Sequence, residues 1–155
     1  MPIERPIQEL DAVFTVQRLV RFSDCDPAGI VFYPQYFVML NGVVEDWFNH
    51  SLQVDYATLL GPRRIGLPIA SLQCDFKNPS RMGEGIEFHL QLLRQGDRSL
   101  TLSVQCKGTL APHTIRWSAK LVIVTTSLAD GRPIPIPQDI AQGIARWQTL
   151  SKECT

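Results

Sequence analysis

Three segments in the second half of the chain alternate apolar and polar residues. The even-numbered positions of residues 70–76, 86–92 and 100–106 are apolar, and the residues between them are polar. Strict alternation predicts half-buried β-strands. Residues 95–98 (Gln-Gly-Asp-Arg) predict a tight hairpin connection between the last two strands. Residues 115–125 are more continuously apolar, which favours a strand near the centre of the sheet.

The first third of the chain predicts one strand followed by one long helix. Residues 13–22 are rich in β-formers, and the turn residues of segment 23–29 end that strand. A helix is expected over residues 34–50, because a proline stands at its first position and heavy apolar residues recur at spacings of three and four. Shorter helices are expected near residues 55–60 and 138–147.

The order of these elements indicates an α+β domain in which an antiparallel sheet wraps around one long central helix. We expect a single domain over residues 1–155, with a core at about 13–137 and a C-terminal tail at 138–155. One helix covers only one face of such a sheet. The other face and the edge strand stay open, so a homodimer formed by face or edge pairing is expected.

The composition narrows the functional classes. Charged residues make up 19% of the chain, below the usual level of about 25%, and 15 Lys plus Arg balance 15 Asp plus Glu. A zero net charge argues against a nucleic-acid binder. No apolar run approaches the ~20 residues of a membrane span, and the start lacks the features of a signal peptide.

The cysteines and histidines of the chain show no pattern of metal ligands. The four cysteines have no CxxC pair, and the three histidines are dispersed. Free reduced thiols in the cytoplasm are therefore expected, without a metal site.

Segment 24–36 holds the densest chemistry in the chain. Asp24 and Asp26 stand in a turn just before the predicted helix start. The first N–H groups of a helix lack internal partners and carry partial positive charge, so they can polarise a carbonyl. A carboxylate near that carbonyl could attack it or activate water against it. The alternative is that Asp24 or Asp26 only forms an Asx-turn or caps the chain locally.

The run Asp-Cys-Asp-Pro-Ala-Gly-Ile-Val-Phe-Tyr-Pro-Gln-Tyr at 24–36 resembles the signature of the 4-hydroxybenzoyl-CoA thioesterase family. Residues 66–69 followed by a strand also fit, and the element order agrees over residues 13–137. The resemblance implies a hot-dog fold and hydrolysis of an acyl-CoA, such as aromatic 4-hydroxybenzoyl- or benzoyl-CoA, without a metal or redox cofactor. It also implies an active site at a dimer interface, with pairs of dimers forming a tetramer.

The resemblance also assigns roles to individual residues. Asp26 corresponds to the catalytic carboxylate, as nucleophile or general base, and Tyr33 to the residue whose backbone N–H polarises the thioester carbonyl. Gly29 lets the backbone approach a ligand closely. Arg98 stands where the family grips the phosphates of coenzyme A, although Asp97 beside it leaves only one cation there. Arg132 is the second candidate for the phosphates. For both arginines, a solvated surface position remains the alternative.

Several other residues are weaker candidates for the active site. Asp24 is expected to hold the turn, and Cys25 to be inert because its acidic neighbours raise the pKa of a thiol. Arg63 and Arg64 are expected to be surface cations. Glu45 is a reserve candidate, because a second branch of hot-dog thioesterases uses a helix carboxylate. The aromatic residues of the long helix are expected in the core, and Trp117 either lines an acyl pocket or fills a sheet interface.

Other functions remain open at this stage. The enzyme could act on acyl groups carried by acyl carrier protein or on short aliphatic acyl-CoA. A hot-dog hydratase would pair a histidine with an acid, and no histidine lies near segment 24–36. The protein could also be a non-catalytic module that binds acyl-CoA, but the presence of Asp26 argues against this function.

Overall fold

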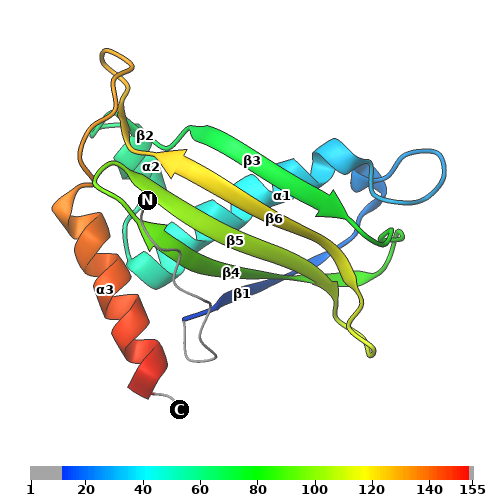
Figure 1. Ribbon diagram of the computed structural model, residues 1–155. Helices are drawn as coiled ribbons and strands as arrows, with labels where there is room; N and C mark the ends of the chain where they lie inside the picture. The colour runs from blue at the N-terminus through cyan, green and yellow to red at the C-terminus, as the bar shows by residue number, and fades with distance from the viewer. Residues whose placement is uncertain (1–11, 154–155) are drawn as a thin grey trace.

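The protein is described by a computed structural model that covers residues 12–153. A five-stranded antiparallel sheet with the order β1-β4-β5-β6-β3 curves around helix α1 (Figure 1). A small second sheet pairs β2 with β7. The strands are β1 (Phe14–Leu19), β2 (Ile65–Gly66), β3 (Ile69–Phe76), β4 (Gly85–Gln95), β5 (Ser99–Gly108), β6 (Ile115–Val124) and β7 (Thr126–Ser127).

The helices take different positions around this sheet. Helix α1 runs along one face of the sheet, and α3 stands at one end of the molecule (Figure 1). The helical elements are η1 (Phe22–Asp24), α1 (Tyr33–Asp46), η2 (Trp47–Leu52), α2 (Tyr56–Leu60) and α3 (Gln138–Glu153). The predicted α+β arrangement of strand, long helix and four long strands is confirmed.

The core lies between α1 and the inner face of the sheet. Leu40 and Val43 of α1 are almost fully buried, as are Phe88 of β4 and Leu102 of β5. In β4 and β5 the buried residues are the even-numbered apolar ones, so the alternation in the sequence does mark the covered face.

Strand β3 differs from the expectation of a half-buried strand. Ala70 and Phe76 are exposed, and Leu72 and Cys74 are only partly covered. The reason is its position, because among residues 12–153 strand β3 pairs with β6 alone and so lies at the edge of the sheet. Strand β6 is internal as expected, but the middle strand is β5.

The long helix changes its winding near its end. The α-helix stops at Asp46, and the chain continues as a π-helix from Trp47 to Leu52, where Gln53 adopts a left-handed conformation with φ of 56°. The predicted end near residue 50 falls inside this π-helix. Such segments are rare in proteins and mark a local departure from regular winding.

Helix α3 is longer than predicted and packs against the π-helix. The Trp147 ring lies 5.4 Å from the Trp47 ring in an edge-to-face arrangement. The Arg146 side chain donates a hydrogen bond of 2.8 Å to the Leu52 carbonyl. Residues 138–153 of the C-terminal tail thus fold against the core, which the sequence pattern alone did not show. Among residues 12–153, no helix is long and apolar enough to cross a membrane.

The two ends of the sheet carry different loops. At the end that we call the α1 end, α1 begins and β3 finishes, and residue 31 bonds to residue 80 just before β4. At the opposite end lie the connection between β4 and β5 and the small β2–β7 sheet (Figure 1). Since β4 has 11 residues, the ends are roughly 35 Å apart at ~3.4 Å per residue.

Candidate active site

The turn before α1 is a closed loop held by its own backbone. Cys25 pairs with Val31 in an antiparallel bridge, and the Asp26 N–H donates to the Ile30 carbonyl at 3.0 Å. Gly29 closes the turn with a bond of 2.9 Å from its N–H to the Asp26 carbonyl. Its φ of +75° lies in the left-handed region, which explains the glycine there. The loop therefore presents Asp26 from a defined backbone.

The two oxygens of the Asp26 carboxylate have different surroundings. Oδ1 accepts a hydrogen bond of 2.8 Å from the Ala28 N–H, which is an Asx-turn. Among the described residues, Oδ2 has no hydrogen-bond partner, and the side chain is partly exposed. The local role expected as the alternative is thus present, and it orients the carboxylate while leaving one oxygen available for chemistry.

The start of α1 offers a free backbone donor at Tyr33. Tyr33 is the first residue of the helix and Pro34, the second, has no N–H. The Gln35 N–H donates to the Phe32 carbonyl at 2.8 Å, whereas the Tyr33 N–H meets no acceptor within residues 12–153. No side chain of the described residues caps this helix start. The Tyr33 N–H can therefore donate to a ligand oxygen.

The neighbours of Asp26 have structural roles. Asp24 Oδ2 accepts a bond of 2.8 Å from the Arg21 N–H and closes the short helix η1, as expected for a residue that holds the turn. The Cys25 thiol contacts the Arg21 carbonyl at 3.4 Å. Partial desolvation and the carboxylates of Asp24 and Asp26 raise the pKa of the Cys25 thiol, so it is a poor nucleophile at neutral pH.

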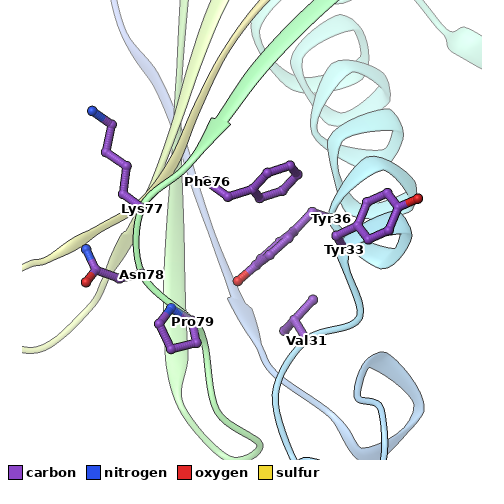
Figure 2. Close-up of a pocket in the computed structure, with 7 residues that line it drawn as sticks. All are labelled: Val31, Tyr33, Tyr36, Phe76, Lys77, Asn78 and Pro79. Carbon is purple, nitrogen blue, oxygen red and sulfur yellow. The ribbon is translucent and has the colours of Figure 1, made fainter.

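A pocket with a volume of about 300 Å³ opens between the start of α1 and the end of β3 (Figure 2). This volume lies at the lower end of the range for small-molecule sites. The ring of Phe76 is 6.1 Å from that of Tyr33 and 6.2 Å from that of Tyr36. The lining residues are Val31, Tyr33, Tyr36, Phe76, Lys77, Asn78 and Pro79. An aromatic cavity therefore adjoins the free donor at the helix start.

Sequence reasoning missed this pocket. It placed Tyr36 in the helix core, and Tyr36 is indeed buried, but the same residue also lines the pocket. The alternation of β3 marked Phe76 as apolar without showing that it faces the start of α1. Trp117 fills the core behind, with its ring 5.7 Å from the Tyr36 ring and fully buried.

The two arginines predicted to grip phosphates do not lie near Asp26 in the same chain. Arg98 precedes β5 and Arg132 follows β7, at the end of the sheet opposite to α1. The Arg98 carbonyl accepts from the Thr125 N–H at 2.9 Å, and the Arg132 carbonyl accepts from the Ser127 N–H at 2.8 Å. The structure thus brings the two arginines to one end, and Asp26, Gly29 and Tyr33 to the other. Both arginine side chains are exposed, and Arg98 lies 3.4 Å from Asp97.

The remaining candidates lie elsewhere. The Arg63 guanidinium binds both oxygens of Asp139, at 2.7 and 2.9 Å, and so joins the end of α2 to α3. Arg64 reaches the Leu128 carbonyl at 3.4 Å. Glu45 is exposed in the last turn of α1, far from Tyr33. Within residues 12–153, no group of three or more His, Cys, Asp or Glu side chains is placed to hold a metal ion.

Comparison with known proteins decides the family. Residues 20–144 match the model of the thioesterase-like superfamily. The chain belongs to the thioesterase-like superfamily. A 1,4-dihydroxy-2-naphthoyl-CoA hydrolase of Synechocystis sp. is 22% identical over 136 residues, which are 88% of this chain and 92% of that protein. A 4-hydroxybenzoyl-CoA thioesterase of Pseudomonas sp. is 35% identical over 63 residues, which are 40% of this chain and 45% of that protein. The family resemblance and the enzyme class, thioester hydrolase, are confirmed.

Solved structures agree on the fold. A 1,4-dihydroxy-2-naphthoyl-CoA thioesterase from Synechocystis superposes with a TM-score of 0.78 at 21% identity, covering 86% of this chain and 96% of that one. The 4-hydroxybenzoyl-CoA thioesterase from Pseudomonas sp. strain CBS-3 gives a TM-score of 0.76 at 24% identity, covering 85% and 99%. The predicted hot-dog fold is confirmed.

Proposed function

We propose that this thioesterase hydrolyses aromatic acyl-CoA thioesters to the free acid and coenzyme A. The observation that carries the proposal is the juxtaposition of three features at the α1 end. They are the Asp26 carboxylate with one free oxygen, the unpaired Tyr33 N–H and the aromatic pocket beside it. Relatives named for 4-hydroxybenzoyl-CoA and 1,4-dihydroxy-2-naphthoyl-CoA support an aromatic acyl group.

The chemistry follows from these positions. The acyl group enters the pocket, and the thioester carbonyl accepts a hydrogen bond from the Tyr33 N–H, which stabilises negative charge on that oxygen. As a general base, Asp26 Oδ2 takes a proton from water, whose oxygen adds to the carbonyl carbon. The C–S bond then breaks and coenzyme A leaves as its thiol, taking up that proton. As a nucleophile, Asp26 would instead add to the carbonyl carbon and expel coenzyme A as its thiolate, which leaves an anhydride. Water would then hydrolyse the anhydride to the free acid and the Asp26 carboxylate, and the proton released would go to the thiolate.

We further propose that the working unit is a homodimer joined through the β3 edge. In the part of the chain that the structure describes, strand β3 has one unpaired side, and the exposed Phe76 and Tyr33 adjoin it. A two-fold axis would pair β3 antiparallel with its copy. The opposite end of one chain would then lie beside the α1 end of the other. Arg98 and Arg132 of the partner subunit could thus reach the coenzyme A phosphates near Asp26, and two such dimers would form the expected tetramer.

A thiol-release assay over a panel of thioesters tests the substrate class. The panel contains aromatic acyl-CoA, short aliphatic acyl-CoA and acyl groups on acyl carrier protein. We expect the highest kcat/KM for the aromatic CoA esters. Preference for the aliphatic or carrier-bound thioesters would overturn the aromatic assignment, and acyl-CoA binding without any thiol release would favour a non-catalytic binding module.

We also propose the cytoplasm as the compartment of this enzyme. The described cysteines Cys25, Cys74 and Cys106 are unpaired, which suits a reducing environment. Cys154 lies outside the described residues.

A further inference from the structure

A buried pair of hydroxyl groups lies at the aromatic pocket. The Tyr36 hydroxyl donates a hydrogen bond of 2.7 Å to Ser80 Oγ. Tyr36 is 4% exposed and Ser80 is 0% exposed, so bulk water does not reach the pair freely. The aromatic core continues behind it, with the Trp117 ring edge-on to Tyr36. A polar pair is therefore buried beside aromatic side chains.

One of the two hydroxyl protons of this pair lacks an acceptor among the described residues. Two hydroxyl groups carry two protons, and the bond between them uses one. Within residues 12–153, no acceptor is found for the second proton. A buried donor without a partner is costly, and native proteins rarely leave one. Because hydroxyl protons rotate, the Tyr36 oxygen can either accept or donate toward a further polar atom.

The pocket places that oxygen within reach of a ligand. Figure 2 shows the Tyr36 ring extending from α1 toward the 77–79 segment, with its hydroxyl between Val31 and Pro79. The Lys77 ammonium and the Asn78 amide point away from this space (Figure 2). The Asn78 amide is bonded to the Ile115 carbonyl at 2.8 Å. Among the side chains drawn in Figure 2, that of Tyr36 thus directs a polar atom into the space between α1 and the 77–79 segment.

We propose that Tyr36, held by Ser80, is a specificity-determining residue that selects acyl groups whose aromatic ring bears a hydroxyl. This inference deepens the proposed function and rests on it. A site built to hydrogen-bond a substrate hydroxyl disfavours the analogue that lacks one, because the protein group then stays unpaired. An unsubstituted benzoyl group would fill the cavity and leave the Tyr36–Ser80 pair unsatisfied.

Two variants separate recognition from support of the fold. Tyr36→Phe removes the hydroxyl that faces the pocket, and Ser80→Ala removes only its partner. Both lose the same internal hydrogen bond. Tyr56→Phe is the matched control, because Tyr56 packs against Phe48 at the other end of α1. Circular dichroism and thermal unfolding check that each variant folds.

The readout is the ratio of affinities for free 4-hydroxybenzoate and benzoate, measured by titration calorimetry, together with kcat/KM for their CoA esters. We expect the wild type and Tyr56→Phe to prefer the hydroxylated compound about tenfold. Ser80→Ala should keep only part of this preference, because the Tyr36 hydroxyl loses the bond that holds it. In Tyr36→Phe the ratio should fall to near one, with benzoate affinity unchanged. The inference is wrong if the wild type shows no preference or binds neither acid, or if Tyr36→Phe keeps the preference.

The two proposals fail in different ways. If the acids bind with a preference that Tyr36→Phe abolishes, but no CoA ester is hydrolysed, the pocket inference stands and the proposed function falls. If the CoA esters are hydrolysed and Tyr36→Phe leaves the ratio of kcat/KM values unchanged, the function stands and the role of Tyr36 is overturned.

Discussion

At the scale of single residues, the two oxygens of the Asp26 carboxylate differ in their hydrogen bonds. Oδ1 is committed to the Ala28 N–H, which fixes the turn, and Oδ2 stays available. The sequence could name Asp26 as a candidate from its motif, but it left the Asx-turn and the catalytic role as alternatives. The structure shows that the turn is present and uses only Oδ1, so the turn is compatible with the proposed role of Oδ2.

The Asx-turn predicts different stabilities for two substitutions. Asparagine keeps an amide oxygen that can accept from the Ala28 N–H, whereas alanine removes the acceptor. We expect Asp26→Ala to lower the free energy of unfolding by about 1 kcal/mol, and Asp26→Asn to leave it nearly unchanged. Urea denaturation of both variants measures this, and equal losses would show that the turn bond contributes little.

At the scale of elements, α3 and the π-helix form one packed unit. Gly143 of α3 stands against Leu52 so closely that an added Cβ would lie 2.6 Å from the Leu52 carbonyl oxygen. The glycine therefore permits the close approach of the two helices. The π-helix keeps the Leu52 carbonyl facing α3, where Arg146 also bonds to it.

The space around two helical glycines, Gly143 and Gly42, predicts opposite effects on stability when each is changed to alanine. Gly143→Ala should destabilise the protein by about 1–3 kcal/mol, because backbone must shift to admit the methyl group. Gly42→Ala in α1 meets nothing within 4 Å and should stabilise by about 0.5–1 kcal/mol through helix propensity. Thermal or urea unfolding compares the two. Similar stability of both variants would contradict the tight α3 contact.

The ion pair that joins α2 to α3 predicts a pH dependence. Hydrogen bonds from Arg63 lower the pKa of the Asp139 carboxyl below its usual value. The contribution of the ion pair to stability is therefore present above the unfolded-state pKa of about 4, and it is lost as the pH falls from there through the lowered folded-state pKa. We expect Asp139→Asn to unfold at a lower temperature than the wild type at pH 7. At pH 3 the difference in unfolding temperature between the two proteins should be smaller. A constant difference across this range would exclude the pair as the cause.

Strands and helices also differ in how well the sequence pattern predicts their burial and contacts. Alternation located β4 and β5 well, because both strands have one face on α1 and one face away from it. It failed for the burial of β3, since an edge position depends on the order of strands in the sheet. The contact of α3 with the π-helix involves residues about 90 positions apart, such as Leu52 and Arg146. No local periodicity encodes such a pairing.

At the scale of the whole molecule, the candidate residues divide between two ends of one sheet. Asp26 and Tyr33 lie at the α1 end, and Arg98 and Arg132 lie at the opposite end. The sequence could place each residue on a loop, but it could not show this separation, which follows from the length of β4 and β5. An antiparallel dimer would reunite the two sets, and a chain of zero net charge offers little repulsion against such self-association.

A shared site predicts complementation between inactive variants. Asp26→Asn lacks the reacting carboxylate. The double variant Arg98→Ala/Arg132→Ala lacks the two cations that are proposed to bind the coenzyme A phosphates in the site of the partner subunit. A mixed dimer would contain one intact site, so equilibrated mixtures should recover about a quarter of the wild-type rate. Thiol release from the mixture measures this. A rate no higher than the mean of the two separate variants would contradict a site shared between chains.

The most direct test of the central claim is thiol release from 4-hydroxybenzoyl-CoA by the wild type and by Asp26→Asn. The substitution keeps the shape of the turn and removes the group that attacks the thioester or activates water. The account predicts turnover by the wild type, and a loss of about a thousandfold or more in kcat for Asp26→Asn with substrate binding retained. Hydrolysis by Asp26→Asn at close to the wild-type rate would contradict it.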